Sequence, residues 1–166
     1  SETWTRNVSV ASLKALQETG APVRDIIGFD LRPGAYRMTV TLEDIYGDKQ
    51  GTLEAVLGEH AFEGGSMTTS EILFSSSLDR VEGEGRFVKH GWEVLPNTTR
   101  GYRVGNPLYV YFEIYNLKVQ ADRENDAFVL GYSLADSSGI PVKSYPDQLL
   151  RKPGESVVMM DSLDTE

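Results

Sequence analysis

The sequence predicts an all-β protein built as an immunoglobulin-like antiparallel β-sandwich with Greek-key connections. Three features of the 166-residue chain support this fold class. Its apolar residues lie in short separated runs, several runs alternate with polar residues at a period of two, and Gly- or Pro-containing turns separate them. The number of runs fits either one sandwich or two packed sandwich units, and an up-and-down β-barrel is the alternative architecture.

The clearest alternation runs through residues 35–45. Its apolar positions on one side of an extended chain are Tyr36, Met38, Val40 and Leu42. Residues 52–57 alternate in the same way, and the loop between the two runs contains glycines that can adopt a positive φ. The two segments are therefore predicted to form a β-hairpin.

The turn that precedes the first of these strands reads Leu-Arg-Pro-Gly-Ala-Tyr at 31–36. Pro followed by Gly suits the centre of a type II turn. A tyrosine at the start of the next strand matches the tyrosine corner of Greek-key sandwiches, in which the hydroxyl bonds to backbone a few residues upstream. The other interpretation is an ordinary turn followed by a strand that begins with Tyr36. Either one bears on the fold and not on the function.

A second pair of strong strand signals lies at 108–117 and 127–135. Each run has apolar residues at every second position, and a polar connection joins them. Adjacent amphipathic runs joined by a polar loop predict a second β-hairpin. Weaker strand signals occur in six further segments, which are 4–10, 24–31, 70–75, 86–95, 140–144 and 155–160.

A Glu-Gly-Gly-Ser segment at 63–66 interrupts the strand pattern and marks the expected domain boundary. Residues 1–63 are then a partial or smaller β-sheet unit with the Pro-Gly-x-Tyr strand, and residues 66–166 are a β-sandwich unit. The first unit has too few strands for a sandwich of about seven. We therefore expect its strands to join a sheet from residues after Ser66 or from a longer parent chain, of which this chain would be a fragment.

Composition excludes several classes of function. The chain has 25 acidic and 16 basic residues, a net charge of −9, so its surface repels nucleic acids and anionic membranes. It has no cysteine, which excludes disulfides, thiol catalysis and cysteine-bound metals. No apolar run reaches the length of about 18 residues that would suggest insertion into a membrane.

One strand carries the candidate binding surface. On the face opposite its aliphatic side chains stand Tyr109, Tyr111, Glu113 and Tyr115, and Trp92 is a further candidate. Aromatic rings with a polar tip suit positions that bury a ring and keep a hydrogen bond. This row either stacks a sugar or docks a partner chain, or else both faces of the strand are covered by neighbouring parts of the protein.

No catalytic or metal-binding set stands out, so we expect a protein that is not an enzyme and needs no cofactor. His60 and His90 lack metal-ligand spacing, and no Gly-x-Ser-x-Gly motif is present. An enzyme, the third function considered, would need a cleft where carboxylates converge on one of these histidines. The alternating Asp122, Glu124 and Asp126 lack the glycine and terminal glutamate of an EF-hand, so a solvated loop is expected there instead of a calcium site.

Segments 71–76, 95–97 and 107–117 resemble the C-terminal β-region of bacterial GWxTD-domain proteins. Those proteins also tend to carry a Pro-Gly-x-Tyr strand followed by an Asp, as residues 33–36 and Asp44 do here. The motif that names the family is absent from this chain. The resemblance implies the C-terminal β-sandwich region of a larger envelope-associated bacterial protein, and it implies no catalytic residues.

The expected function is a non-catalytic β-sandwich module for protein–protein interaction or structural assembly within such a protein. Its partner would be another protein or another domain of the same parent chain. The alternative is a carbohydrate-binding module that uses an exposed tyrosine face. A periplasmic or extracellular location follows from the resemblance, and a cytoplasmic one is left open.

Overall fold

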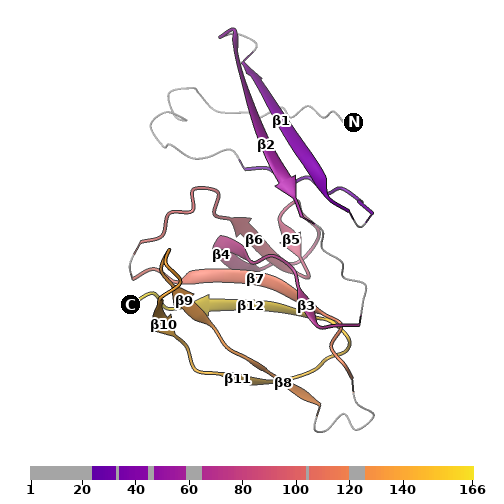
Figure 1. Ribbon diagram of the computed structural model, residues 1–166, viewed down its shortest axis with the longest axis vertical. Coiled ribbons are helices and arrows are strands. Elements are labelled where there is room, and N and C mark those ends of the chain that lie inside the picture. Colours follow the sequence, from indigo (N-terminus) through magenta and orange to yellow (C-terminus); the bar gives the residue numbers. More distant parts are fainter. Residues whose placement is uncertain (1–23, 33, 45–46, 59–64, 104, 120–125) are drawn as a thin grey trace.

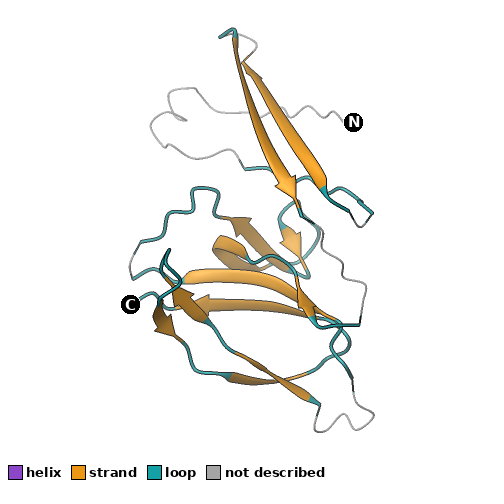
Figure 2. Cartoon of the chain, in the orientation of Figure 1, coloured by secondary structure: helices purple, strands orange, loops and turns teal. Residues whose placement is uncertain are grey.

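The computed structural model describes residues 24–32, 34–44, 47–58, 65–103, 105–119 and 126–166. Within these ranges the protein is all-β, with twelve strands and no helix (Figure 2). Every strand pair is antiparallel. The all-β prediction is therefore confirmed.

The first strands are β1 (Tyr36–Asp44), β2 (Lys49–Leu57), β3 (Thr68–Thr69), β4 (Leu73–Arg80), β5 (Val88–Lys89) and β6 (Trp92–Pro96). The remaining strands are β7 (Leu108–Tyr115), β8 (Ala127–Leu130), β9 (Ser133–Ala135), β10 (Pro141–Ser144), β11 (Gln148–Arg151) and β12 (Val157–Leu163).

Strands β1 and β2 form the predicted N-terminal hairpin. They pair from Tyr36 opposite Leu57 to Asp44 opposite Lys49 without a register shift. The Tyr36 hydroxyl donates a hydrogen bond to the carbonyl oxygen of Arg32 at 2.8 Å, four residues upstream. This is the contact expected of a tyrosine corner, although here it begins a two-stranded sheet that projects beyond the other strands (Figure 1).

The largest sheet has the order β12-β7-β4-β6-β5, and β3 pairs with the end of β7. Strand β7 lies inside this sheet. Along one edge it pairs with β12, from Leu108 opposite Leu163 to Ile114 opposite Val157. Along its other edge it pairs with β4 and then with β3. Its backbone hydrogen bonds are therefore used on both sides, which suits a run rich in aromatic and β-branched residues.

A second layer packs against one face of this sheet. Strands β8 and β11 form one pair, and β9 and β10 form another. Two apolar clusters fill the space between the layers. One centres on the buried Phe112, Ile114, Leu117 and Met159, and the other on Leu108, Val110 and Leu163. Side chains from the second layer, such as Phe128 and Leu134, complete these clusters.

The predicted hairpin between 108–117 and 127–135 is wrong. Strand β7 pairs with β12, whereas β8 pairs with β11 and lies in the other layer (Figure 1). The apolar faces of the two runs do meet, but across the core: Phe128 and Leu130 pack against the cluster that contains Phe112. Alternation fixes which side of a strand is buried, and it leaves open whether the neighbour lies beside the strand or over it.

The weaker strand signals have mixed outcomes. Segment 140–144 coincides with β10, whereas 70–75 and 155–160 overlap only the beginnings of β4 and β12. Segment 86–95 contains two short strands joined by a turn at His90 and Gly91, both with positive φ. Segment 24–31 has no strand, and 4–10 lies outside the described residues.

The N-terminal hairpin does not share a sheet with the later strands. Among the described residues, β1 pairs only with β2, so no strand after Ser66 extends its sheet as one of our expectations required. An ion pair between Asp25 and Arg86 links the segment before the hairpin to the sandwich.

A buried ion pair fastens one end of the second layer. Asp126 is 3% exposed, and its carboxylate accepts a hydrogen bond from the Lys152 ammonium at 2.6 Å. The same ammonium donates to the carbonyl oxygen of Lys118 at 2.7 Å. The backbone N–H of Lys152 donates to the backbone carbonyl oxygen of Asp126. Asp126 therefore departs from the solvated loop expected of it, because a nearby lysine compensates its charge. Asp122 and Glu124 lie outside the described residues.

Replacing Lys152 with methionine should lower the free energy of unfolding by about 3–5 kcal/mol, because it leaves a buried carboxylate unpaired. Urea unfolding monitored by circular dichroism measures this loss. Lys118→Met is the matched control, since Lys152 contacts only its backbone carbonyl, and it should change the free energy by less than about 0.5 kcal/mol. Equal losses in the two variants would contradict the role given to the ion pair.

Candidate functional site

The outer face of β7 carries a hydrogen-bonded cluster of two tyrosines and a glutamate. Alternation along the strand puts Tyr111, Glu113 and Tyr115 on the face opposite the core. The Tyr111 hydroxyl donates to the Glu113 carboxylate at 2.7 Å, and the Tyr115 hydroxyl donates to its other oxygen. Three of the residues predicted as a binding surface therefore bond to one another.

The turn between β5 and β6 brings the side chains of Lys89 and His90 to this cluster. His90 and Gly91 have φ values of 51° and 78°, as a two-residue hairpin turn of type I′ requires. Next to this turn, the Lys89 ammonium lies 5.1 Å from the centre of the Tyr111 ring, within the range of a cation–π contact. The His90 imidazole lies 3.9 Å from the Glu113 carboxylate.

These contacts shift the pKa values in opposite directions. Burial acts to raise the pKa of Glu113, but the hydrogen bonds from Tyr111 and Tyr115 and the electrostatic effects of Lys89 and His90 together outweigh it and leave the pKa below its ordinary value. Burial and the bond to Glu113 raise the pKa of Tyr115 to about 12, and they raise that of Tyr111 further. The cluster therefore holds a carboxylate beside two neutral phenols over a wide range of pH.

The tyrosines do not form an exposed stacking platform. Tyr111 is 2% exposed, so its ring is not available to a sugar. The interpretation in which both faces of the strand are covered is the one that holds for this residue. Tyr109 turns to a separate cavity, and the Trp92 ring packs under the Arg80 guanidinium at 5.9 Å. The sequence did not indicate that Lys89 would lie over the Tyr111 ring.

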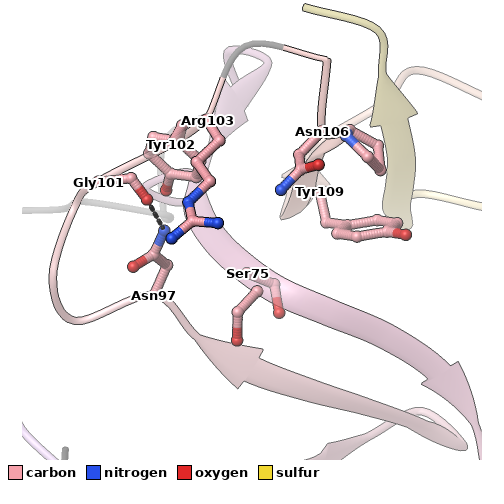
Figure 3. Close-up of a pocket in the computed structure, with 9 residues that line it drawn as sticks. Ser75, Asn97, Gly101, Tyr102, Arg103, Asn106 and Tyr109 are labelled. Carbon is pink, nitrogen blue, oxygen red and sulfur yellow. Dashed lines mark hydrogen bonds between the residues drawn. The ribbon is translucent and has the colours of Figure 1, made fainter. Parts of the chain in front are cut away.

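The cavity beside Tyr109 has a volume of about 380 Å³ and lies between β4, β7 and the loop residues 97–103 and 105–107. Most of the side chains that line it are polar or aromatic, and the main ones are Ser75, Asn97, Tyr102, Arg103, Asn106 and Tyr109. Figure 3 shows the Arg103 guanidinium between Asn97 and Asn106, above Ser75. Of these residues only Tyr109 was predicted from the sequence as a binding residue, because the others stand in a loop without a strand pattern or at scattered strand positions.

A third surface lies on the β1–β2 hairpin. Leu42 and Leu53 belong to its apolar face and are largely exposed, and Val56 is exposed on the other face. Arg37 and Glu54 form an ion pair at 3.3 Å on that second face. The hairpin thus combines exposed apolar side chains with strand edges to which no other described strand is paired.

Within the described ranges, no three histidine, aspartate or glutamate side chains gather closely enough to hold a metal ion. The same part of the chain has no helix that is long and apolar enough to cross a membrane. His60 lies outside the described residues, and His90 joins the Glu113 cluster.

Comparison with known proteins gives no match: no family model, curated protein or solved structure is similar to this chain. The function must therefore be argued from the three surfaces themselves.

The tyrosine–glutamate cluster predicts a particular dependence of stability on pH. A tyrosine whose pKa is raised on folding stabilises the fold fully below pH 10.0, its unfolded value, and loses that effect as pH rises through about 12. Glu113, whose pKa is lowered, stabilises the fold above its unfolded value of 4.5 and loses that effect in acid. Urea unfolding at a series of pH values should show constant stability through the neutral range and losses on both sides.

Tyr115→Phe removes one donor to Glu113 and should cost about 1 kcal/mol at neutral pH, since the site is partly exposed to water. It should also reduce the loss of stability above pH 10.0. Tyr109→Phe, a phenol outside the cluster, is the control. Identical acid and alkaline profiles for both variants and the parent protein would contradict the coupling.

Proposed function

We propose that this protein is a non-catalytic interaction module whose β1–β2 hairpin contacts another polypeptide. The observation that carries the proposal is the exposure of apolar side chains on a hairpin outside the main sheets. Leu42 is 71% exposed on the same face as the half-buried Val40, and Leu53 lies opposite Val40 on β2. Apolar residues thus recur at every second position on one face of the hairpin, a pattern typical of a strand whose apolar face is covered by another element.

The energetics of a two-stranded sheet support this function. An isolated hairpin is at best marginally stable in water, because it buries little apolar surface to offset the entropy of ordering its backbone. Strands of nine residues each, paired without a break, are long for such an element. A partner that covers the apolar face would supply the missing burial.

The strand edges suggest how a partner would bind. Each strand of the hairpin has one edge without a partner among the described residues. Such an edge accepts an extended segment of another protein, in which main-chain hydrogen bonds supply affinity and alternate side chains supply specificity. We propose that the partner adds a strand whose apolar residues extend the face of Val40 and Leu53.

The finer features of the fold are part of the same proposal. Two layers with a shared apolar core support an immunoglobulin-like sandwich with Greek-key connections. The resemblance to GWxTD-domain proteins supports a place in a larger bacterial protein of the cell envelope, in the periplasm or outside the cell.

The alternative, a carbohydrate-binding module with an exposed tyrosine face, has less support. It needs three exposed and roughly coplanar rings, and Tyr111 is buried under Lys89. Tyr109 lines a cavity instead of standing in a row of exposed rings.

The proposal is tested by photo-crosslinking from the hairpin. A photoreactive amino acid at Leu42 should crosslink to a defined protein in an extract of the source organism, because that position lies in the proposed contact. The same group at Glu84, an exposed residue between β4 and β5, should not. The crosslinked protein is then purified and its affinity for the unmodified chain is measured.

Leu42→Lys should weaken that affinity at least tenfold, since it places a charge in the apolar contact. Leu149→Lys is the matched control, because Leu149 is a leucine on β11 that is 76% exposed. It should change the affinity by less than about twofold. Equal weakening by both substitutions, or by the control alone, would place the contact elsewhere and contradict the proposal.

A further inference from the structure

We propose that the cavity beside Tyr109 binds an acidic sugar of the uronate class, with Arg103 holding its carboxylate. This ligand site is separate from the hairpin and shares no residue with it. The larger cavity near β8, about 480 Å³, is a weaker candidate because Asp126 already neutralises its buried Lys152.

The charge of the cavity is the first argument. The protein carries a net charge of −9, yet the described residues that line this cavity include Arg103 and no aspartate or glutamate. Within the described part of the chain, no carboxylate forms an ion pair with Arg103. A guanidinium is a planar fork of donors that fits a carboxylate through two parallel hydrogen bonds. The Arg103 guanidinium can therefore bind the carboxylate of a ligand in this cavity.

The neutral groups are the second argument. Asn97 is held in place, because its amide nitrogen donates to the Gly101 carbonyl at 3.0 Å and its amide oxygen accepts from Thr99 at 2.8 Å. Ser75 lies buried at the base of the cavity and donates to the Leu95 carbonyl at 2.7 Å, which leaves its oxygen as an acceptor. Amides and hydroxyls in fixed positions suit a ligand that carries several hydroxyl groups.

The aromatic rings and the size complete the case for a sugar. Tyr102 packs edge-on against Phe74 at 6.1 Å, and Tyr109 lies across the cavity from it (Figure 3). Rings on the walls can cover the apolar C–H face of a sugar. A volume of about 380 Å³ lies near the lower end of the range for small-molecule sites, so one or two sugar rings would fill it.

A phosphate is a poorer match than a carboxylate. Arg103 is the only cationic side chain among the described residues that line the cavity, so one of the two negative charges of a dianion would have no partner there. The Glu166 carboxylate also approaches the backbone at Gly105, on the same loop, and adds negative potential nearby. A single negative charge on a polyhydroxylated body is therefore the chemistry that fits.

The test is a titration of the full chain, followed by NMR amide shifts, with glucuronate and galacturonate. Each is compared with its neutral counterpart, glucose or galactose, and with acetate and inorganic phosphate. The proposal expects at least one uronate to bind with a Kd of about 1 mM or tighter and to shift the amides of Ser76, Arg103 and Asn106. The matching neutral sugar and acetate should each bind at least tenfold more weakly. The neutral sugar lacks the carboxylate for Arg103, and acetate lacks the hydroxyl groups.

Arg103→Gln should weaken uronate binding at least tenfold. Arg100→Gln removes the same charge from the same loop at a residue that does not line the cavity, and it should leave the affinity within about twofold. Asn106→Ala, a second variant, should also weaken binding. Equal effects of the two arginine substitutions, or phosphate or acetate binding as tightly as the uronate, would overturn the proposal without affecting the one made for the hairpin.

Discussion

The described fold depends on pairing both edges of β7 while burying its aliphatic face and, on the other face, Tyr111. Phe112 and Ile114 point into the core between the layers, and Tyr111 on the other face is equally inaccessible to water. Strands β12 and β4 occupy the two edges. Each layer is thus defined by its relation to this strand: the large sheet extends sideways from it, and the second layer packs over its aliphatic face.

The two faces of β7 are stabilised by different physics. The aliphatic face contributes hydrophobic burial, which tolerates neighbours of many shapes. The tyrosine face contributes directed hydrogen bonds to a single carboxylate, which need the neighbouring turn to be in place. The polar cluster at Glu113 therefore specifies how β5 and β6 lie, and the core specifies only that a layer must cover β7.

Much of the local structure could be predicted from the sequence, and much of the pairing could not. Period-two alternation placed β1 and β7 to within two residues and found β2 without its first three residues, because side-chain direction in a strand is a local property. The partner of β7 proved to be β12, which is distant in sequence, and alternation carries no information on such contacts. Burial of Tyr111 and Asp126 likewise depends on Lys89 and Lys152, whose proximity arises only in the fold. The candidate cavity could not be predicted for the same reason, because strand residues and loop residues that are distant in sequence line it together.

The central claim is that the sandwich around β7 is stable by itself and that the β1–β2 hairpin awaits a partner. Native-state hydrogen exchange of the isolated chain tests it most directly, because exchange reports the opening free energy of each segment. The account predicts that amides of β7 exchange slowest and that those of β1 and β2 exchange at least about 100-fold faster. Protection of β1 and β2 equal to that of β7 in the monomer would contradict it, since the hairpin would then be part of the cooperative core.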